Sequence, residues 1–342
     1  MMHLKPNTSS NKIVRAVICL LFFTVISAAA WMTPIAFDDA FNFQVSQSLA
    51  GKFSYQSKYI PTKIYNGVIT TNGPVQYLMA GMIKIFGLDV GRSLTLGAIG
   101  AVMVSSVYSY SIRGFIGYCL LIICWPLLAY LNASFLGEIL AAAMMISGIN
   151  HLEQWQEELA NLDASGCKLT SKNIWLKIQL WISGVALGLA VSTKLIALAF
   201  SVLVVICLSA AKIQKRKLKK SALLIYVMPV LFIAVLFFLL QFSISILHSG
   251  GNIYSIWNSM LSFVNDHIHQ AGIARIKYGI DCLYIQPYEV QILLVVAVSA
   301  IVMCCNSVYY LPLIISLLIM MIFFHLNFLK VNPRLCRGTT KV

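Results

Sequence analysis

The sequence AVICLLFFTVISAAAWMTPIAF, residues 16–37, is an uncharged apolar run that ends directly at Asp38 and Asp39. Its length matches the roughly 20 residues that a helix needs to cross a bilayer. Residues 1–15 are polar and basic, so the run predicts a first span that begins in the cytoplasm. Both aspartates are then expected on the outer side of the membrane. A cleaved signal peptide is the alternative, because small residues at 27–30 resemble a cleavage site.

The composition predicts an all-α polytopic membrane protein. Hydrophobic residues make up 59% of the 342 residues and charged residues 11%, and the mean hydropathy is +0.83. A soluble domain has about 45–50% apolar and about 25% charged residues. The apolar residues form long runs without the alternation of a membrane barrel. The net charge of +14 lies mostly between these runs, as in cytoplasmic loops, so no nucleic-acid partner is expected.

The segment after the first span, residues 38–91, is expected to be the first outer loop. Asp39 is placed to N-cap a helix over residues 40–50. One face of that helix carries Phe41, Val45 and Leu49. Pro74 to Phe86 is apolar but too short to span, which predicts a helix lying in the membrane interface.

The remaining apolar runs predict eight further spans in one membrane domain, nine in total. Six of them, spans 2–7, fall within residues 92–247, and residues 248–289 form the second outer loop. The expected segments are residues 93–112, two spans in 114–150 with a turn at 132–138, a cytoplasmic loop with a short helix at 151–177, two spans in 178–211, one in 221–247, and two in 290–329.

Lys194 is expected at an outer turn. The apolar stretch 178–211 has basic residues on both flanks, so both of its ends are cytoplasmic and the number of crossings is even. Its single charge, Lys194, then lies at the tip between two short spans, on the same side as Asp38.

The tail, residues 330–342, is basic, although nine spans place it outside. The positive-inside rule disagrees with that placement, which leaves the orientation of the last two spans open.

The first outer loop resembles that of the GT-C glycosyltransferases, in particular the branch with protein O-mannosyltransferases and lipid A aminoarabinose transferases. The residues that carry the resemblance are Asp38-Asp39, then FQVSQSLAGK at residues 43–52, then Gly73-Pro74 and the segment up to Arg92. Gly137-Glu138 is similar to the family's second outer acidic site. The span from Gly184 that ends in Ser192-Thr193-Lys194 resembles its glycine-rich span.

This resemblance implies an enzyme with its site at the outer face and a polyprenyl-phosphate sugar as donor. Asp38 is the expected base, Asp39 its partner or substitute, Lys194 and Arg92 the contacts to the donor phosphate, and Glu138 a second acidic contact. The acceptor is a hydroxyl of a lipid, glycan or protein. The expected location is a cell membrane, bacterial and inner, with membrane lipids around the spans and the site facing the periplasm or exterior.

Plainer interpretations stay open beside these roles. Asp38 and Asp39 also suit a solvated loop start, Glu138 a turn, Arg92 an interfacial anchor, and Lys194 a lysine that extends to the interface. A transporter or flippase of lipid-linked saccharides is the alternative function. Because the tail matches no family element, a short variant or a truncated, inactive copy is a third interpretation.

The need for a metal is left open by the sequence. Asp266, His267 and His269 lie together in the second outer loop. On a helix, residues two apart point in different directions, which favours ordinary loop histidines over metal ligands. The resemblance permits a divalent cation without requiring one.

Overall fold

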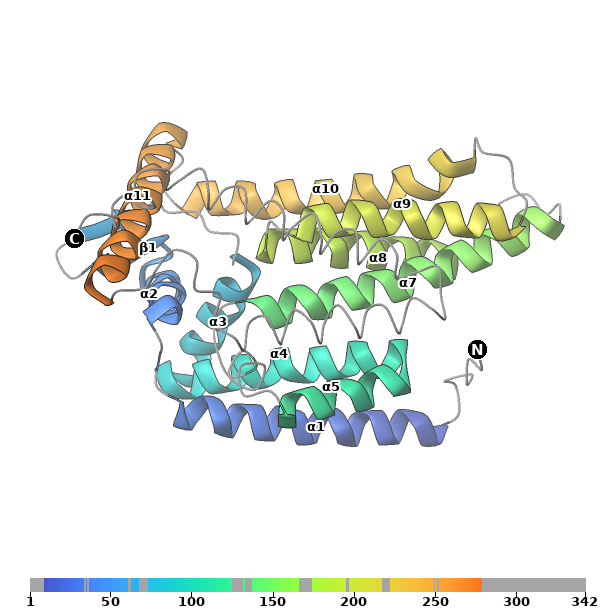
Figure 1. Cartoon of the computed structure of the whole chain (residues 1–342), viewed down its shortest axis with the longest axis horizontal. Coiled ribbons are helices and arrows are strands. Elements are labelled where there is room, and N and C mark those ends of the chain that lie inside the picture. The colour runs from blue at the N-terminus through green and yellow to red at the C-terminus, as the bar shows by residue number, and fades with distance from the viewer. Residues whose placement is uncertain are drawn as a thin grey trace, which may run out of the picture.

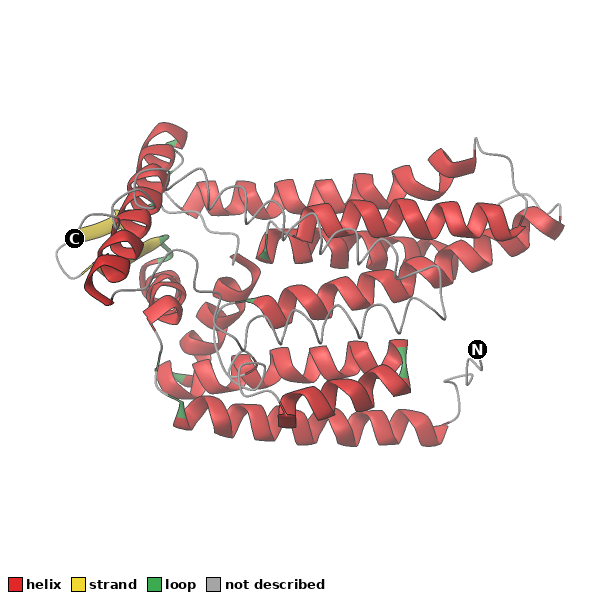
Figure 2. Cartoon of the chain, in the orientation of Figure 1, coloured by secondary structure: helices red, strands yellow, loops and turns green. Residues whose placement is uncertain are grey.

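The computed structural model is almost entirely helical (Figures 1 and 2). It describes residues 9–33, 35, 37–60, 63–67, 73–124, 132, 137–165, 174–194, 197–216, 222–248, 250 and 252–278. The helices are α1 (Ser9–Met32), α2 (Phe37–Lys52), α3 (Gly73–Phe86), α4 (Leu88–Tyr110), α5 (Ile112–Cys124), α7 (Glu138–Ser165), α8 (Ile174–Thr193), α9 (Ala197–Arg216), α10 (Ala222–His248) and α11 (Ile253–Tyr278). The strands β1 (Gln56–Ile60) and β2 (Lys63–Asn66) form one antiparallel hairpin.

Four of the described helices are long and apolar enough to cross a membrane. They contain the segments Ile13–Met32, Leu88–Tyr110, Trp175–Thr193 and Leu223–His248. In α9 a shorter apolar segment covers Phe200–Gln214. The expectation of an all-α membrane protein is therefore confirmed, whereas the count of nine spans stays a prediction. The last two expected spans (290–329) and the tail (330–342) lie outside the described residues.

The long helices lie side by side and alternate in direction (Figure 1). Helices α1, α5, α8 and α10 run toward the end of the bundle that carries α2, α3, the hairpin and α11, which we call the outer end. Helices α4, α7 and α9 run away from it. The basic segments around Lys177 and Lys212 therefore lie at the opposite end. The positive-inside rule predicts that this end is the cytoplasmic one, which stays a prediction.

Small residues let these helices approach closely. A Cβ atom on Gly97 of α4 would lie 2.7 Å from the carbonyl oxygen of Phe23 in α1. A Cβ atom on Gly188 of α8 would lie 2.6 Å from the carbonyl oxygen of Ala234 in α10. Membrane helices use glycine in this way, because backbone packing replaces the hydrophobic effect that lipid does not supply.

The first helix ends earlier than the sequence predicts. The expected span covers residues 16–37, but α1 ends at Met32 and a new helix, α2, begins at Phe37. Pro34 lies between them in the sequence, and proline cannot donate the hydrogen bond that would continue a helix. Asp39 lies inside the first turn of α2, so its predicted role as N-cap is wrong.

Helix α4 begins earlier than the predicted start of the second span at residue 93. It starts at Leu88, directly after Gly87, whose φ of 81° breaks the chain between α3 and α4. Arg92 therefore belongs to the helix and does not precede it. It lies one turn inside the outer end of α4.

The segment 151–177, predicted as a cytoplasmic loop with a short helix, contains more helix than expected. Helix α7 continues without interruption to Ser165. Leu152, Trp155 and Leu159 are buried in a core shared with α8, α9 and α10, and this burial stabilises a polar segment as helix. The predicted pair of helices around Lys194 is confirmed as α8 and α9.

The first outer loop is a packed unit. The predicted helix after Pro74 is confirmed as α3, which packs against α2, α4, α8 and α10. The hairpin between α2 and α3 was not predicted, and it lies against α2 and α11. This loop is therefore fixed to the outer end of the bundle.

Candidate functional site

Asp39 is buried in the first turn of α2, where only 2% of the residue is exposed. The predicted apolar face of this helix is confirmed, since Phe41, Val45 and Leu49 are all buried. An acidic residue in a first turn also interacts favourably with the positive end of the helix dipole. Asp38 belongs to the same turn, but its side chain lies outside the described part of the structure.

A buried chain of hydrogen bonds connects α2 to α3 and to Tyr55, the residue directly before β1. Gln76 Nε2 donates to Asn42 Oδ1 at 2.8 Å, and the hydroxyl of Tyr55 donates to Gln76 Oε1. All three residues are at most 3% exposed. Because Asn42 lies one turn after Asp39 on α2, this network fixes the helix that carries the two aspartates.

Glu138 and Lys194 form an ion pair at the outer end. Lys194 Nζ lies 2.8 Å from Glu138 Oε1, and their side chains are 25% and 43% exposed respectively. Glu138 is the first residue of α7 and follows Gly137, whose φ is 85°. Lys194 lies in the turn after α8, where its carbonyl accepts a hydrogen bond from the Ala197 N–H at 2.9 Å. Two residues singled out separately in the sequence therefore contact each other.

Arg92 lies at the junction of α1 and α4. Only 8% of it is exposed, and its Nη2 donates to the carbonyl oxygen of Thr33 at 2.9 Å. It borders a cavity of about 260 Å³ together with Trp31, Asp89 and Ser93. The buried hydroxyl of Ser93 has no hydrogen-bond partner among the described residues. A guanidinium and a free hydroxyl can bind an anion, although the Asp89 carboxylate opposes this.

The candidate residues reach the outer end on different helices. Asp39 comes from α2, Arg92 from α4, Glu138 from α7, and Lys194 from the end of α8. Helix α3 contacts both α2 and α8, so it connects the aspartate helix to the lysine turn. Figure 1 shows the start of α7 and the end of α8 next to α3.

A metal site is not defined by the side chains that the structure describes. Among them, no group of three or more His, Cys, Asp and Glu residues comes close enough to hold an ion. The side chains of His267 and His269 lie outside this part.

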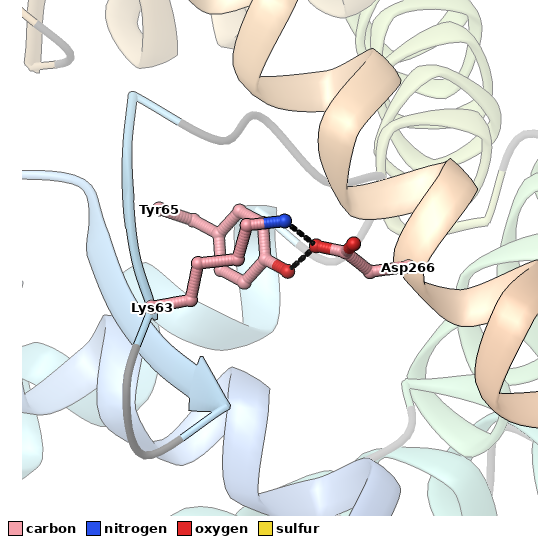
Figure 3. A network of polar contacts seen from close by, with 3 residues as sticks. All are labelled: Lys63, Tyr65 and Asp266. Carbon is pink, nitrogen blue, oxygen red and sulfur yellow. Dashed lines mark hydrogen bonds and ion pairs between the residues drawn. The ribbon is translucent and has the colours of Figure 1, made fainter.

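Sequence reasoning missed a second polar cluster, shown in Figure 3. Lys63 Nζ of β2 lies 2.6 Å from Asp266 Oδ2 of α11, and the hydroxyl of Tyr65 donates to the same oxygen. The two segments are 203 residues apart in the chain. The sequence shows only isolated charges in two different loops, so it contains no signal for this contact.

No protein-family model, curated protein or solved structure matches this chain.

Proposed function

We propose that this protein is a membrane glycosyltransferase of the GT-C type. It moves a sugar from a polyprenyl-phosphate donor to a hydroxyl of a lipid, glycan or protein acceptor at the outer face of the membrane. One observation carries the proposal: Asp39, Arg92, Glu138 and Lys194, scattered over the sequence, all lie at the same end of the helical bundle. That end is the outer one by the distribution of basic residues.

The two aspartates supply the carboxylates that the reaction needs. The acceptor hydroxyl loses its proton to Asp38, and its oxygen attacks the anomeric carbon as the bond to the phosphate oxygen breaks, with inversion. The transition state resembles an oxocarbenium ion, which a nearby carboxylate stabilises. The burial of Asp39 suits a partner that orients and supports Asp38.

The leaving group is a polyprenyl phosphate, on which negative charge develops during transfer. Lys194 and Arg92 are the cations proposed to stabilise it. The Lys194 ammonium has three donors, so it can contact phosphate while keeping Glu138 as a neighbour. Arg92 has a planar guanidinium with five donors, a geometry that suits a phosphate group.

Glu138 takes a supporting part in this proposal. Its carboxylate holds Lys194 at the outer turn, 2.8 Å away, so that the cation stays at the membrane surface. The role inferred from the resemblance, a second acidic contact to donor or acceptor, remains compatible with its 43% exposed side chain.

The substrates determine where the reaction takes place. A polyprenyl donor lies in the bilayer, so the expected location is a bacterial inner membrane with the site on the periplasmic or exterior side. In a transporter, charges would line a pathway near the membrane midplane. Within the described helices, residues 93–110 of α4, 178–193 of α8 and 222–247 of α10 carry no charge, which favours the enzyme.

The test is mass spectrometry of envelope lipids, glycans and glycoproteins from a strain that lacks the gene. The strain is complemented with wild type, with Asp38→Asn plus Asp39→Asn, or with Glu158→Gln, which removes an acid at the opposite end. We expect one glycan mass to be lost, then restored by wild type and Glu158→Gln only. Restoration by the double variant at equal expression would contradict the carboxylate mechanism and favour the transporter.

A further inference from the structure

A second cavity lies between the hairpin and α11, apart from the candidate residues described above. Its volume is about 410 Å³, within the range of roughly 300–1,000 Å³ typical of small-molecule sites. Strand β2 contributes Lys63, Ile64 and Tyr65, and α11 contributes the rest of the lining, which includes Tyr254, Asn258 and Ser259.

Helix α11 presents one polar face to this cavity. Ser255, Asn258, Ser259 and Ser262 follow the i, i+3, i+4, i+7 pattern of one side of a helix. Within the described part of the chain, the side chains of Asn258 and Ser259 make no hydrogen bond. Their donors and acceptors are therefore available to a ligand.

Aromatic packing and an ion pair hold the walls of the cavity in place. The rings of Phe263 and Phe41 have centroids 4.7 Å apart, and those of Phe263 and Tyr65 are 5.6 Å apart, edge to face. These contacts fix α11 to α2 and to the hairpin. Asp266 then binds both Lys63 and Tyr65 through one oxygen, as Figure 3 shows.

The same contacts determine the net charge of the cavity lining. The carboxylate of Asp266 compensates the ammonium of Lys63 at 2.6 Å. What remains along the cavity is a set of hydroxyls, one amide and the tyrosine rings. A neutral ligand with many hydroxyl groups fits this lining better than an anion does.

We propose that this cavity binds a neutral saccharide, as the sugar part of the acceptor. Aromatic rings pack against the apolar faces of sugars, while serine and asparagine exchange hydrogen bonds with sugar hydroxyls. Tyr254 is 75% exposed and extends the site toward solvent, as binding of a glycan chain requires. The assignment of the ligand as the acceptor rests on the proposed function, whereas saccharide binding itself is tested separately.

The experiment measures saturation-transfer-difference NMR signals with the full chain in lipid nanodiscs. The probes are maltotriose and methyl α-mannoside, with glucose 6-phosphate as the charged comparison. Ser259→Trp fills the cavity from a partly exposed position. Asn265→Trp places the same bulk on an exposed position of α11 outside the lining.

We expect signals from at least one neutral sugar with wild type and Asn265→Trp, and loss of these signals with Ser259→Trp. Equal signals from Ser259→Trp, or none from either neutral sugar with wild type, would overturn the proposal. A stronger signal from glucose 6-phosphate would overturn its neutral character.

Asp39→Asn separates this proposal from the proposed function. This variant is expected to keep sugar binding, because Asp39 does not line the cavity. If Asp39→Asn also keeps full transfer, the enzyme mechanism fails while the binding site stands. If wild type forms its glycan product but binds no neutral sugar, the cavity proposal fails and the enzyme mechanism stands.

Discussion

Lys194 and Glu138 meet at 2.8 Å, joining the turn after α8 to the first residue of α7. The two side chains are 25% and 43% exposed, so solvent screens the pair. A pair of this kind contributes roughly 1 kcal/mol or less to stability. The main role that we propose for Lys194 is therefore contact with the donor phosphate.

Replacing both partners separates the contribution of the ion pair to stability from the proposed role of Lys194 in sugar transfer. Lys194→Met with Glu138→Leu removes both charges together, so neither is left unpaired. We expect the thermal unfolding midpoint in detergent to stay near that of wild type, and sugar transfer to fall about 10²-fold or more. Full transfer by this double variant would show that Lys194 serves only the fold.

The close contact of α8 with α10 predicts a strong effect at Gly188. A Cβ atom there would lie 2.6 Å from the Ala234 carbonyl oxygen, so Gly188→Ala forces the helices apart. We expect a loss of about 1–3 kcal/mol in stability, measured as a lower unfolding midpoint. Gly81→Ala in α3 is the control, because nothing lies within 4 Å of its added Cβ atom. An equal effect of the two substitutions would argue against the packing of α8 on α10.

The buried hydrogen bonds among Tyr55, Gln76 and Asn42 are predicted to hold α2 in place within the first outer loop. Gln76→Leu keeps the size of the side chain but removes the acceptor of the Tyr55 hydroxyl and the donor to Asn42 Oδ1. Loss of each of these hydrogen bonds is expected to cost roughly 1 kcal/mol. We expect faster proteolysis within residues 53–72 and reduced transfer, while the bundle stays folded. Unchanged proteolysis would mean that the network does not hold α2 in place.

The orientation of the bundle is tested by labelling single cysteines in a cysteine-free background. Lys58→Cys lies on β1 at the outer end, and Gln214→Cys lies near the end of α9 at the opposite end. We expect a membrane-impermeant maleimide to label residue 58 in intact cells, and residue 214 only after the membrane is opened. The reverse pattern would place the candidate site in the cytoplasm.

Those features of the fold that follow from charge and length could be predicted from the sequence. The turn at Lys194 follows from basic residues on both flanks of an apolar stretch long enough for two helices. The buried face of α2 follows from the spacing of Phe41, Val45 and Leu49. In each case a local pattern determines the structure.

Other features depend on contacts that no local pattern contains. The sequence predicts a short helix within residues 151–177, but the continuity of this helix with the preceding span in α7 depends on contacts such as that of Trp155 with Tyr226 of α10, whose ring centroids lie 6.1 Å apart. The contact between Asp266 and Lys63 joins two loops that are distant in the chain. The hairpin has only Pro61 and Thr62 between its strands, so it lacks the Asn-Gly or Asp-Gly pair that marks a two-residue hairpin turn in a sequence.

The central claim is that buried Asp39 and its neighbour Asp38 support sugar transfer from a polyprenyl-phosphate donor. The most direct measurement reconstitutes the purified protein with an envelope extract from its own host, which supplies both the polyprenyl-phosphate donors and the lipid, glycan and protein acceptors, and follows the release of free polyprenyl phosphate by mass spectrometry. Wild type is predicted to release it, and Asp38→Asn and Asp39→Asn about 10²–10⁴-fold more slowly, the usual range for losing a catalytic acid or base. Equal release by wild type and both variants, or none by wild type, would contradict the account.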